Sequence, residues 1–404
     1  MPKQQDNLRV PYGLAVHGKE EEERVLAVLR EHRTIMGKET AEFEKKVASL
    51  FGKSIGITVN SGSSANLLAI EILNIQKGSE VITPILTFST TVAPLIMKDL
   101  IPVFVDVEKG SYILNLDQVE KAITTKTRAL MIPFLLGNVP DLVRIKKIAK
   151  KHNLFVILDS CDTLGATFNK KKVGEFGDIC TTSFYGSHII TAGGNGGMLL
   201  VDSQKYADKA KTLRGWGRGS ALIGETEDIG SRYKTKIGQL PYDAKFIFTD
   251  IGYNFLPMEI GSAFGNAQLK KLNKFKKIRE TNFKKLHSFF KKYENLFILP
   301  EQDPLVQTQW LAFPLTIKKL APFSRVDLLT FLEKNNIQTR PIFTGVITKQ
   351  PGFSNIKHKT FLKSFPMTEE VMERGFLIGC HQGLEEKHLK KIEDTFNKFI
   401  KIYK

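Results

Sequence analysis

The sequence predicts an α/β fold, with a large domain on a mostly parallel sheet and a small α+β domain at the C-terminus. Three observations predict it. Short apolar runs alternate with helical patterns from residue 55 to about residue 202, as in a sheet covered on both faces. The chain has 404 residues, which is too long for one small core. Its apolar content of 42% and charged content of 25% are typical of a soluble globular protein.

The alternation begins with "IGITVN" at 55–60, a strand pattern, followed by "SGSSANLLAIEIL" at 61–73, a small-residue turn that opens a helix. A capped amphipathic helix is expected for "PDLVRIKKIAKKHN" at 140–153. Ligands of such sheets bind beyond the carboxyl ends of the strands, so polar residues there are candidate site residues. The other β-rich runs lie at 80–85, 102–107, 128–137, 154–160, 178–186 and 196–202.

Residues 203–250 are rich in glycine and charge and are expected to be irregular, and a loop of that length is usually functional. A long amphipathic helix with a basic, solvated side is expected over 269–296. We therefore predict a large cofactor-binding domain at 1–268 and a small α+β domain at 269–404. The apolar positions at helical spacing are Leu269, Leu272, Phe275, Ile278, Phe283, Leu286 and Phe290.

The charge and the cysteines limit the class of protein. The formal net charge is +17, which the solvated helix explains; general attraction for an anionic substrate such as a nucleotide is another interpretation. Without a stacking motif or zinc finger we expect no nucleic-acid partner. Cys161, Cys180 and Cys380 form no disulfide framework and lack metal-type spacing, which favours a reducing cytosol. With no signal-peptide pattern and no membrane-spanning run, we expect a cytoplasmic protein.

Two strand ends carry residues suited to an anion or to a charged ring. Gly62 and Ser63 stand where the strand at 55–60 gives way to a helix, and free backbone N–H groups there favour a phosphate. A serine-rich helix start is also useful for capping alone. Asp159 closes the apolar run 154–158, where its carboxylate suits a protonated ring nitrogen, although a plain helix cap explains it equally well.

Ser183 and His188 follow the next strand along the chain. A neutral imidazole, with an ordinary pKa of about 6.5, suits general acid or base chemistry at neutral pH, whereas a lone histidine is more often an ordinary polar residue. Phe88, Asp159, Ser183 and His188 nevertheless stand at successive strand ends together with the anion cradle. A phosphate grip, a stacking face, a carboxylate and a proton-transfer group are what a pyridoxal-type cofactor needs.

The chain resembles the sugar-nucleotide aminotransferase family (the DegT/DnrJ/EryC1/StrS group) in "VNSGSSANLL", "TPILTF", "LDSCDTLGATFN", "TSFYGSH" and "DIGYNFLPMEIGSAFGNAQLKKL". The likeness extends from "MGKETAEFEKKVASLFG" at residue 36 to "RPIFTG" and "GCHQGL" near the end. It implies the aspartate aminotransferase-like fold, which is fold type I of the pyridoxal phosphate-dependent enzymes. It also implies a homodimer that shares its active site.

The position of His188 departs from most of this family. Most members have Ser-Phe-x-x-x-Lys there, and the lysine holds pyridoxal phosphate as a Schiff base, which a histidine cannot do. Histidine at this place resembles a smaller branch, the 3-dehydratases of nucleotide-linked 4-keto-6-deoxyhexoses. The resemblance implies that pyridoxamine phosphate is held non-covalently, that His188 moves protons and that L-glutamate regenerates the cofactor. The implied product is a 4-keto-3,6-dideoxy sugar.

The same resemblance assigns the other site residues. It pairs Asp159 with the pyridine nitrogen, stacks Phe88 on the ring and sets Asp162 at the hydroxyl side of the ring. It also brings Asn254 in from the partner subunit. Phosphate binding is assigned to Gly62, Ser63 and Ser183.

Two features depart from the relatives. The CDP-linked enzymes hold an iron–sulfur cluster with four cysteines, three of them in the loop that matches residues 216–233. This loop has no cysteine here, so we expect no iron–sulfur cluster. The turn "AGGNGGM" lacks the glutamate that the family usually has, and it is one residue longer.

Several alternatives stay open at this point. An aminotransferase that uses His188 unusually would retain the amine in its product, and a cofactor-binding sensor would lack catalysis. Nucleic-acid binding would require a salt-dependent interaction with DNA. The nucleotide (GDP, CDP, dTDP or UDP) and the hexose configuration are not fixed. Arg214 and Arg218 are candidates for anion contact, and a solvated loop explains either one as well.

Overall fold

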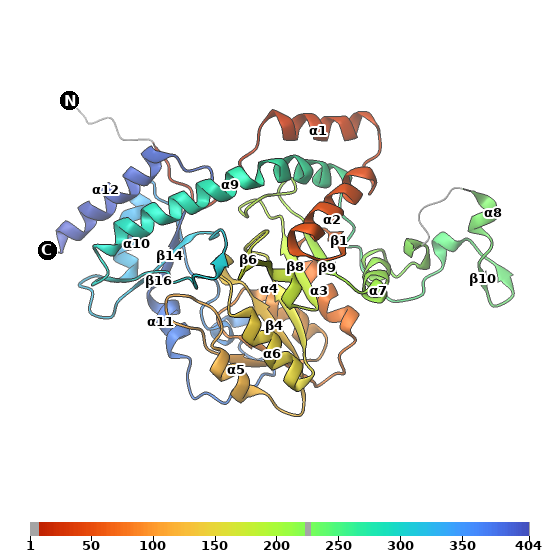
Figure 1. Cartoon of the computed structure of the whole chain (residues 1–404), viewed down its shortest axis with the longest axis horizontal. Coiled ribbons are helices and arrows are strands. Elements are labelled where there is room, and N and C mark those ends of the chain that lie inside the picture. The colour runs from red at the N-terminus through yellow and green to blue at the C-terminus, as the bar shows by residue number, and fades with distance from the viewer. Residues whose placement is uncertain (1–7, 223–227, 404) are drawn as a thin grey trace.

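The computed structural model describes residues 8–222 and 228–403 (Figure 1). Its largest sheet has seven strands in the order β1-β9-β8-β5-β4-β2-β3. β9 is antiparallel to its neighbours β1 and β8, and the other neighbouring pairs are parallel, which confirms the predicted mostly parallel sheet. The strands are β1 (Ile55–Val59), β2 (Glu80–Pro84), β3 (Ile101–Val105), β4 (Thr127–Pro133), β5 (Phe155–Asp159), β8 (Ile179–Ser183) and β9 (Gly197–Val201).

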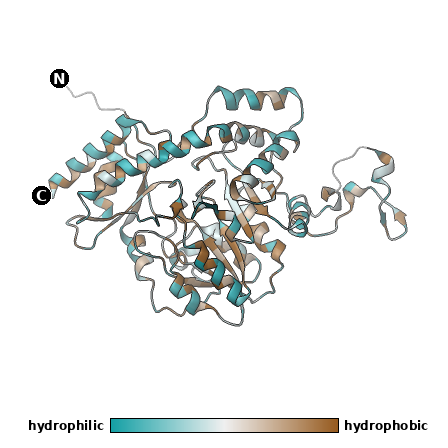
Figure 2. Ribbon diagram, in the orientation of Figure 1, coloured by the Kyte–Doolittle hydropathy of each residue, from teal (hydrophilic) through white to brown (hydrophobic). Residues whose placement is uncertain are grey.

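Helices cover both faces of this sheet. Along β4, Leu130 and Ile132 belong to a core shared with α2 (Lys38–Phe51) and α6 (Leu142–His152). Met131, which points to the opposite face, belongs to a core with α3 (Gly62–Leu73) and α7 (Gln204–Arg214). Figure 2 shows the hydrophobic strands inside and hydrophilic helix faces outside. Burial on both faces fixes the strands, and with them the carboxyl ends of the parallel strands.

One long helix, α9 (Glu259–Lys291), crosses from the large sheet to the C-terminal part of the chain (Figure 1). Its first part packs against α1 (Lys19–Arg30) and α2, and Leu286 and Phe290 lie in the C-terminal core. The predicted helix at 269–296 is therefore present, but it begins at Glu259. The predicted division between residues 268 and 269 falls within α9 and stays a prediction.

The C-terminal part is α+β, as predicted. Its antiparallel sheet has the order β12-β14-β16-β15 and packs on helices through a phenylalanine-rich core. Phe290, Phe297 and Phe396 contact one another edge to face. These elements are β12 (Phe297–Ile298), β14 (Phe313–Ile317), α10 (Arg325–Lys334), β15 (Thr339–Arg340), α11 (Pro366–Arg374), β16 (Gly375–Ile378) and α12 (Glu386–Ile402). The remaining elements include α4 (Ser89–Met97), α5 (Leu116–Ala122), β6 (Thr167–Phe168), β7 (Lys171–Lys172) and β13 (Val306–Gln307).

The prediction that residues 203–250 are irregular is wrong for α7. Ser203 caps this helix by accepting a hydrogen bond from Tyr206 N, and Ala207, Ala210 and Leu213 pack on the large sheet's core. The prediction failed because the glycines after this helix are not typical of the whole segment.

Residues 219–222 and 228–248, here called the arm, extend away from the body of the molecule (Figure 1). The arm includes α8 (Ile229–Arg232), β10 (Lys236–Ile237) and β11 (Leu240–Pro241). Its exposed apolar side chains are Leu222, Ile229, Tyr233, Ile237, Leu240, Tyr242, Phe246 and Phe248. Within the described ranges, no helix is long and apolar enough to cross a membrane.

His381 ties the N-terminal segment to the C-terminal part. Its ring is fully buried, with Nε2 3.0 Å from the Pro11 carbonyl oxygen and Nδ1 accepting from Gly383 N at 3.1 Å. Burial lowers the pKa of His381 from 6.5 to about 4, and the charge of Arg279 adds to this. The imidazole is therefore neutral in the folded protein at neutral pH.

This burial predicts acid sensitivity. The stability gained by burying the neutral ring of His381 is complete above about pH 6.5, the pKa of the unfolded chain. It is lost as pH falls toward about 4, the pKa of His381 in the folded protein. When pH is lowered from 7 to 5, the titration of His381 is expected to reduce the free energy of unfolding by about 2 kcal/mol. Chemical denaturation of a His381→Gln variant should show a shallower loss of stability over this interval. An equal loss in the variant and the wild type would contradict the assignment.

Candidate active site

The strand ends bring four of the predicted residues to one edge of the large sheet. Asp159 is the last residue of β5, and Ser183 is the last residue of the parallel neighbour β8. Gly62 begins α3, and Phe88 directly precedes α4. Because parallel strands end at the same edge, this is where a ligand of such a sheet binds.

Asp159 is held by a buried polar network. Its Oδ2 accepts hydrogen bonds from Asn66 Nδ2 and from Thr91 Oγ1, both at 2.8 Å. Thr181 Oγ1 donates to Asn66 Oδ1 at 2.6 Å and so fixes the orientation of the amide. Among the described residues, Oδ1 accepts one long bond, from Cys161 N at 3.3 Å. The carboxylate is therefore positioned, and Oδ1 retains capacity to accept a charged donor.

The start of α3 forms the predicted anion cradle. Ser61 caps the helix by accepting from Ser64 N at 3.1 Å, which leaves the N–H groups of Gly62 and Ser63 at the positive end of the helix. A Cβ atom on Gly62 would lie 2.7 Å from the Cβ of Ser183, closer than real Cβ atoms approach. The two strand ends thus pack closely at Gly62, where a side chain does not fit. The backbone N–H groups at this helix N-terminus suit an anion.

Phe88 offers a ring at the same edge. Its side chain is 52% exposed, and the edge of its ring contacts Phe343 at a centroid distance of 6.3 Å. Ser63 Oγ donates to Thr90 Oγ1 at 3.0 Å, which joins the starts of α3 and α4. Thr91, in the first turn of α4, bonds Asp159. Phe88 is therefore an exposed ring directly before the helix whose Thr91 bonds Asp159, and it can stack on a ligand there.

His188 lies in a closed loop that follows β8. Phe184 N donates to Gly196 O at 2.9 Å, and Gly186 N donates to Gly194 O at 3.0 Å. Gly194 and Gly196 have φ values of 115° and 148°, which side chains rarely allow. The glycine-rich turn that departs from the family pattern therefore closes the loop that carries His188.

The imidazole of His188 is neutral at neutral pH. Burial lowers its pKa from 6.5 to about 4. The backbone at Ser183 opposes this shift, the charge of Arg279 adds to it by a smaller amount, and the backbone at Cys161 opposes it least. Nδ1 of His188 is buried and has no hydrogen-bond partner among the described residues. A neutral ring with an unpartnered nitrogen is suited to accept a proton.

Asp162 differs from its neighbour Asp159. Burial raises the pKa of Asp162 from 3.8 to about 7, and the charge of Asp159 adds to the rise. Its Oδ2 accepts from Leu136 N at 2.9 Å, and Leu136 has a φ of 58°, uncommon for a residue with a side chain. Asp162 is therefore protonated for part of the time at neutral pH.

The two arginines proposed for anion contact differ in their surroundings. Arg214 is buried and donates to Thr58 O at 2.8 Å and to Glu44 Oε1 at 3.1 Å. It is thus engaged within the protein. The guanidinium of Arg218 lies 4.4 Å from the centre of the Trp216 ring, at the base of the arm.

Asn254 is exposed on the surface of the single chain, where its backbone bridges that of Gly215. Its predicted role requires a second subunit and stays a prediction.

Sequence reasoning missed Asn66, Thr91 and Thr181, the residues that orient Asp159. Asn66 lies on the buried side of α3 and is 2% exposed. The sequence did contain one signal for Asn66: an amide side chain among apolar residues, one turn after the start of the helix, is expected to have a buried polar partner.

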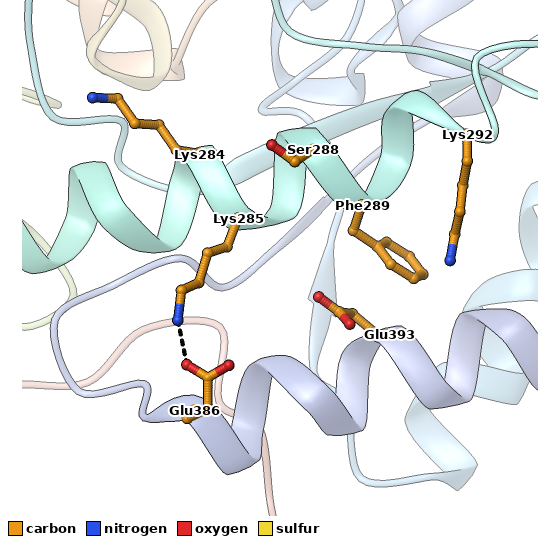
Figure 3. A pocket seen from close by; sticks show the side chains of 7 residues that line it. All are labelled: Lys284, Lys285, Ser288, Phe289, Lys292, Glu386 and Glu393. Atoms are coloured by element: carbon orange, nitrogen blue, oxygen red, sulfur yellow. Dashed lines mark hydrogen bonds and ion pairs between the residues drawn. The ribbon is translucent and has the colours of Figure 1, made fainter.

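A groove of about 600 Å³ lies between α9 and α12 (Figure 3). Lys285 pairs with Glu386 across it, and Lys292 Nζ lies 4.0 Å from the centre of the Phe289 ring. The groove is open and carries both signs of charge. None of the predicted site residues lines this groove. The candidate active site therefore remains the edge of the large sheet, where those residues lie.

Comparison with known proteins identifies the family of the chain. The model of the DegT/DnrJ/EryC1/StrS aminotransferase family matches residues 16–397. The chain is 37% identical over 369 residues to the lipopolysaccharide biosynthesis protein RfbH of Salmonella typhimurium, covering 89% of this chain and 84% of RfbH. It is 35% identical to the dTDP-4-dehydro-2,6-dideoxy-D-glucose 3-dehydratase of Saccharopolyspora spinosa, covering 94% of this chain and 85% of that one.

The solved structures include E. coli GDP-4-keto-6-deoxy-D-mannose 3-dehydratase with bound hydrated pyridoxal phosphate (PLP). It matches with a TM-score of 0.86 and 27% identity over 96% of this chain and 100% of that chain. The likeness confirms the predicted aspartate aminotransferase-like fold, fold type I of the PLP-dependent enzymes. The chain belongs to the DegT/DnrJ/EryC1/StrS aminotransferase family.

Proposed function

We propose that the chain is a 3-dehydratase of a nucleotide-linked 4-keto-6-deoxyhexose and that it uses PLP and pyridoxamine phosphate. The observation that carries the proposal is the half-buried, neutral imidazole of His188 near Ser183, at the position where most of the family has lysine. The 3-dehydratases among the relatives support it. The likeness to RfbH supports a role in making deoxysugars for lipopolysaccharide.

The residues present fit this cofactor. We assign the phosphate to Gly62, Ser63 and Ser183, which lie at the N-terminus of α3 and at the end of β8. Asp159 retains an oxygen for a protonated ring nitrogen, and Phe88 presents a free face to the ring. We assign the ring's hydroxyl side to Asp162, whose pKa is near 7. The site joins the four features that a pyridoxal-type cofactor requires.

When bound, pyridoxamine phosphate supplies an amine for the C4 ketone of the sugar and a ring that accepts electrons as the C3 substituent leaves. His188 removes a proton from the carbon that bears this amine and protonates the departing C3 hydroxyl, so that water is lost. Asp159 keeps the ring nitrogen protonated by its charge. An imidazole, unlike a lysine amine, does not capture the aldehyde form covalently. The product loses its amine as ammonia in water, and L-glutamate restores the cofactor's amine.

We also infer that the active enzyme is a homodimer with a shared active site. The exposed apolar side chains of the arm support this, because large exposed apolar surfaces are usually covered (Figure 2). The exposure of Asn254 supports its reach into the partner's site.

The proposal is tested by incubating the purified protein with PLP, L-glutamate and a panel of GDP-, CDP-, dTDP- and UDP-linked 4-keto-6-deoxyhexoses. Product masses are then measured. A sugar lighter by one oxygen atom, with ammonia released, is expected and identifies the nucleotide. A product in which an amine replaces the ketone would instead establish an aminotransferase. Retained cofactor without any turnover would favour a binding protein.

The cradle predicts a specific effect of Gly62→Ala. The new methyl group would collide with Ser183, so the affinity for PLP is expected to fall about 10-fold, roughly the loss of one hydrogen bond to a charged group. Titration with PLP measures it. Gly352→Ala is the matched control, because nothing lies within 4 Å of a Cβ there. Equal Kd values for both variants would show that Gly62 does not hold the phosphate.

A further inference from the structure

Arg279 on α9 is a buried cation held by neutral acceptors. It is 1% exposed, and its guanidinium donates to Gln382 Oε1 at 2.6 Å, Trp310 O at 3.2 Å and Leu311 O at 3.0 Å. A fourth bond, at 3.3 Å, goes to the backbone oxygen of His188. Among the described residues, no ion pair involves Arg279. Burial lowers its pKa from 12.5 to about 10, so it stays charged at neutral pH.

An unpaired buried charge is costly, and capping carbonyl groups does not require one. Neutral amides do this elsewhere on the same helix: Asn282 Nδ2 donates to His381 O at 3.0 Å and to Leu384 O at 3.3 Å. Arg279 differs from Asn282 in that its guanidinium joins two separate segments, through the carbonyl groups of Trp310 and Leu311 and that of His188.

Gln382 links Arg279 to the residue after His188. Its Oε1 accepts from Arg279, and its Nε2 donates to Ile189 O at 3.3 Å. Two side chains from α9 and from the segment after β16 thus hold two successive carbonyl groups, those of His188 and Ile189. The glycine-rich turn closes the ends of this loop, and these bonds hold its centre.

Other titratable groups lie around this centre, and most are neutral at neutral pH. Burial raises the pKa of Tyr12, Cys161 and Cys380 and lowers that of His381. Asp162 has a pKa of about 7. Arg279 and Arg340 are the cations that act on Tyr12, and the charge of Asp159 acts on Cys161. The remaining neighbour is the phenol of Tyr185, whose ring centre lies 5.9 Å from that of His188.

We propose that Arg279 and Gln382 are positioning residues for His188, which fix the peptide that carries the imidazole. This inference rests on the proposed proton-transfer role of His188. It does not depend on which sugar is the substrate, or on whether the enzyme is a dehydratase or an aminotransferase.

The test uses two readouts that need no sugar. The first is the titration of His188 in the cofactor-free protein, followed by NMR of labelled histidine rings and assigned with a His188→Asn variant. The second is the rate at which L-glutamate converts bound PLP to pyridoxamine phosphate in a single turnover, followed by absorbance. The variants are Arg279→Met, Arg279→Lys and Gln382→Leu. Arg325→Met is the matched control, since Arg325 caps Met372 O and Gly375 O.

In Arg279→Met the titration midpoint of His188 is expected to rise by about one pH unit, and the half-reaction to slow at least 10-fold. Arg279→Lys and Gln382→Leu should slow the half-reaction without a comparable rise, because the charge is kept. Arg325→Met should change neither readout. An unchanged midpoint together with rates within twofold of wild type would overturn the inference.

If Arg279→Met does not fold, Arg279→Lys and Gln382→Leu decide: wild-type rates in both overturn the positioning role. Failure of the proposed function has a different signature. If His188 does not transfer protons, the His188→Asn substitution alone would leave the rate of the L-glutamate half-reaction unchanged.

Discussion

Replacing His188 with asparagine is expected to lower turnover about 1,000-fold while changing the affinity for PLP less than about threefold. Proton transfer by a positioned side chain contributes roughly 10²- to 10⁴-fold, and asparagine cannot accept a proton. The cofactor contacts assigned to Gly62, Ser183 and Asp159 are untouched, so binding should persist. Steady-state turnover and a PLP titration on the same preparation measure the two effects.

An exposed histidine provides the control for this substitution. His152, at the end of α6, is remote in the chain from the loop that carries His188 and is exposed. His152→Asn is expected to match the wild type in both measurements. Turnover within tenfold of wild type in His188→Asn would refute His188 as the proton-transfer residue.

Replacing Asp159 with asparagine is expected to weaken PLP binding about 30-fold and to lower turnover by at least about 100-fold. The carboxylate's charge-assisted bond to a protonated ring nitrogen contributes roughly 2 kcal/mol to binding. Without the negative charge the ring nitrogen loses its proton, and the ring becomes a poorer acceptor of electrons. The loss should therefore affect both affinity and rate, in contrast to His188→Asn.

Asp202 is the matched control for Asp159, because it also follows a strand of the large sheet. It follows β9, which runs antiparallel to β8, and it pairs with Lys53 at 2.7 Å. Asp202→Asn is expected to lower stability and to leave the Kd for PLP unchanged. If Asp159→Asn bound PLP as tightly as Asp202→Asn, the ring-nitrogen assignment would be wrong.

The fold and part of the site follow from local patterns in the sequence. Each buried strand is a short apolar run, so Asp159 and Ser183 are recognised as strand ends, and parallel strands bring such ends to one edge. The start of α3 is readable because serine and glycine mark a helix N-terminus. The helix α7 was missed because its short apolar spacing precedes a glycine-rich stretch.

The rest of the site depends on contacts between distant segments, which local patterns do not record. Asn66 and Thr91 meet Asp159 only after three elements pack together. Arg279 lies among lysines that indicate a solvated face, yet it is turned inward onto the loop of His188. Arg214, a candidate for anion contact, is instead engaged by Glu44. The role of Asn254 depends on a second chain.

A single-turnover reaction tests the central claim most directly. The enzyme is loaded with pyridoxamine phosphate and mixed with the nucleotide-linked 4-keto-6-deoxyhexose that it accepts, without L-glutamate. The account predicts that each bound cofactor yields one sugar lighter by one oxygen atom, one ammonia and one PLP. A sugar that keeps its C3 hydroxyl and gains the amine at C4, with no ammonia released, would contradict the account and establish an aminotransferase.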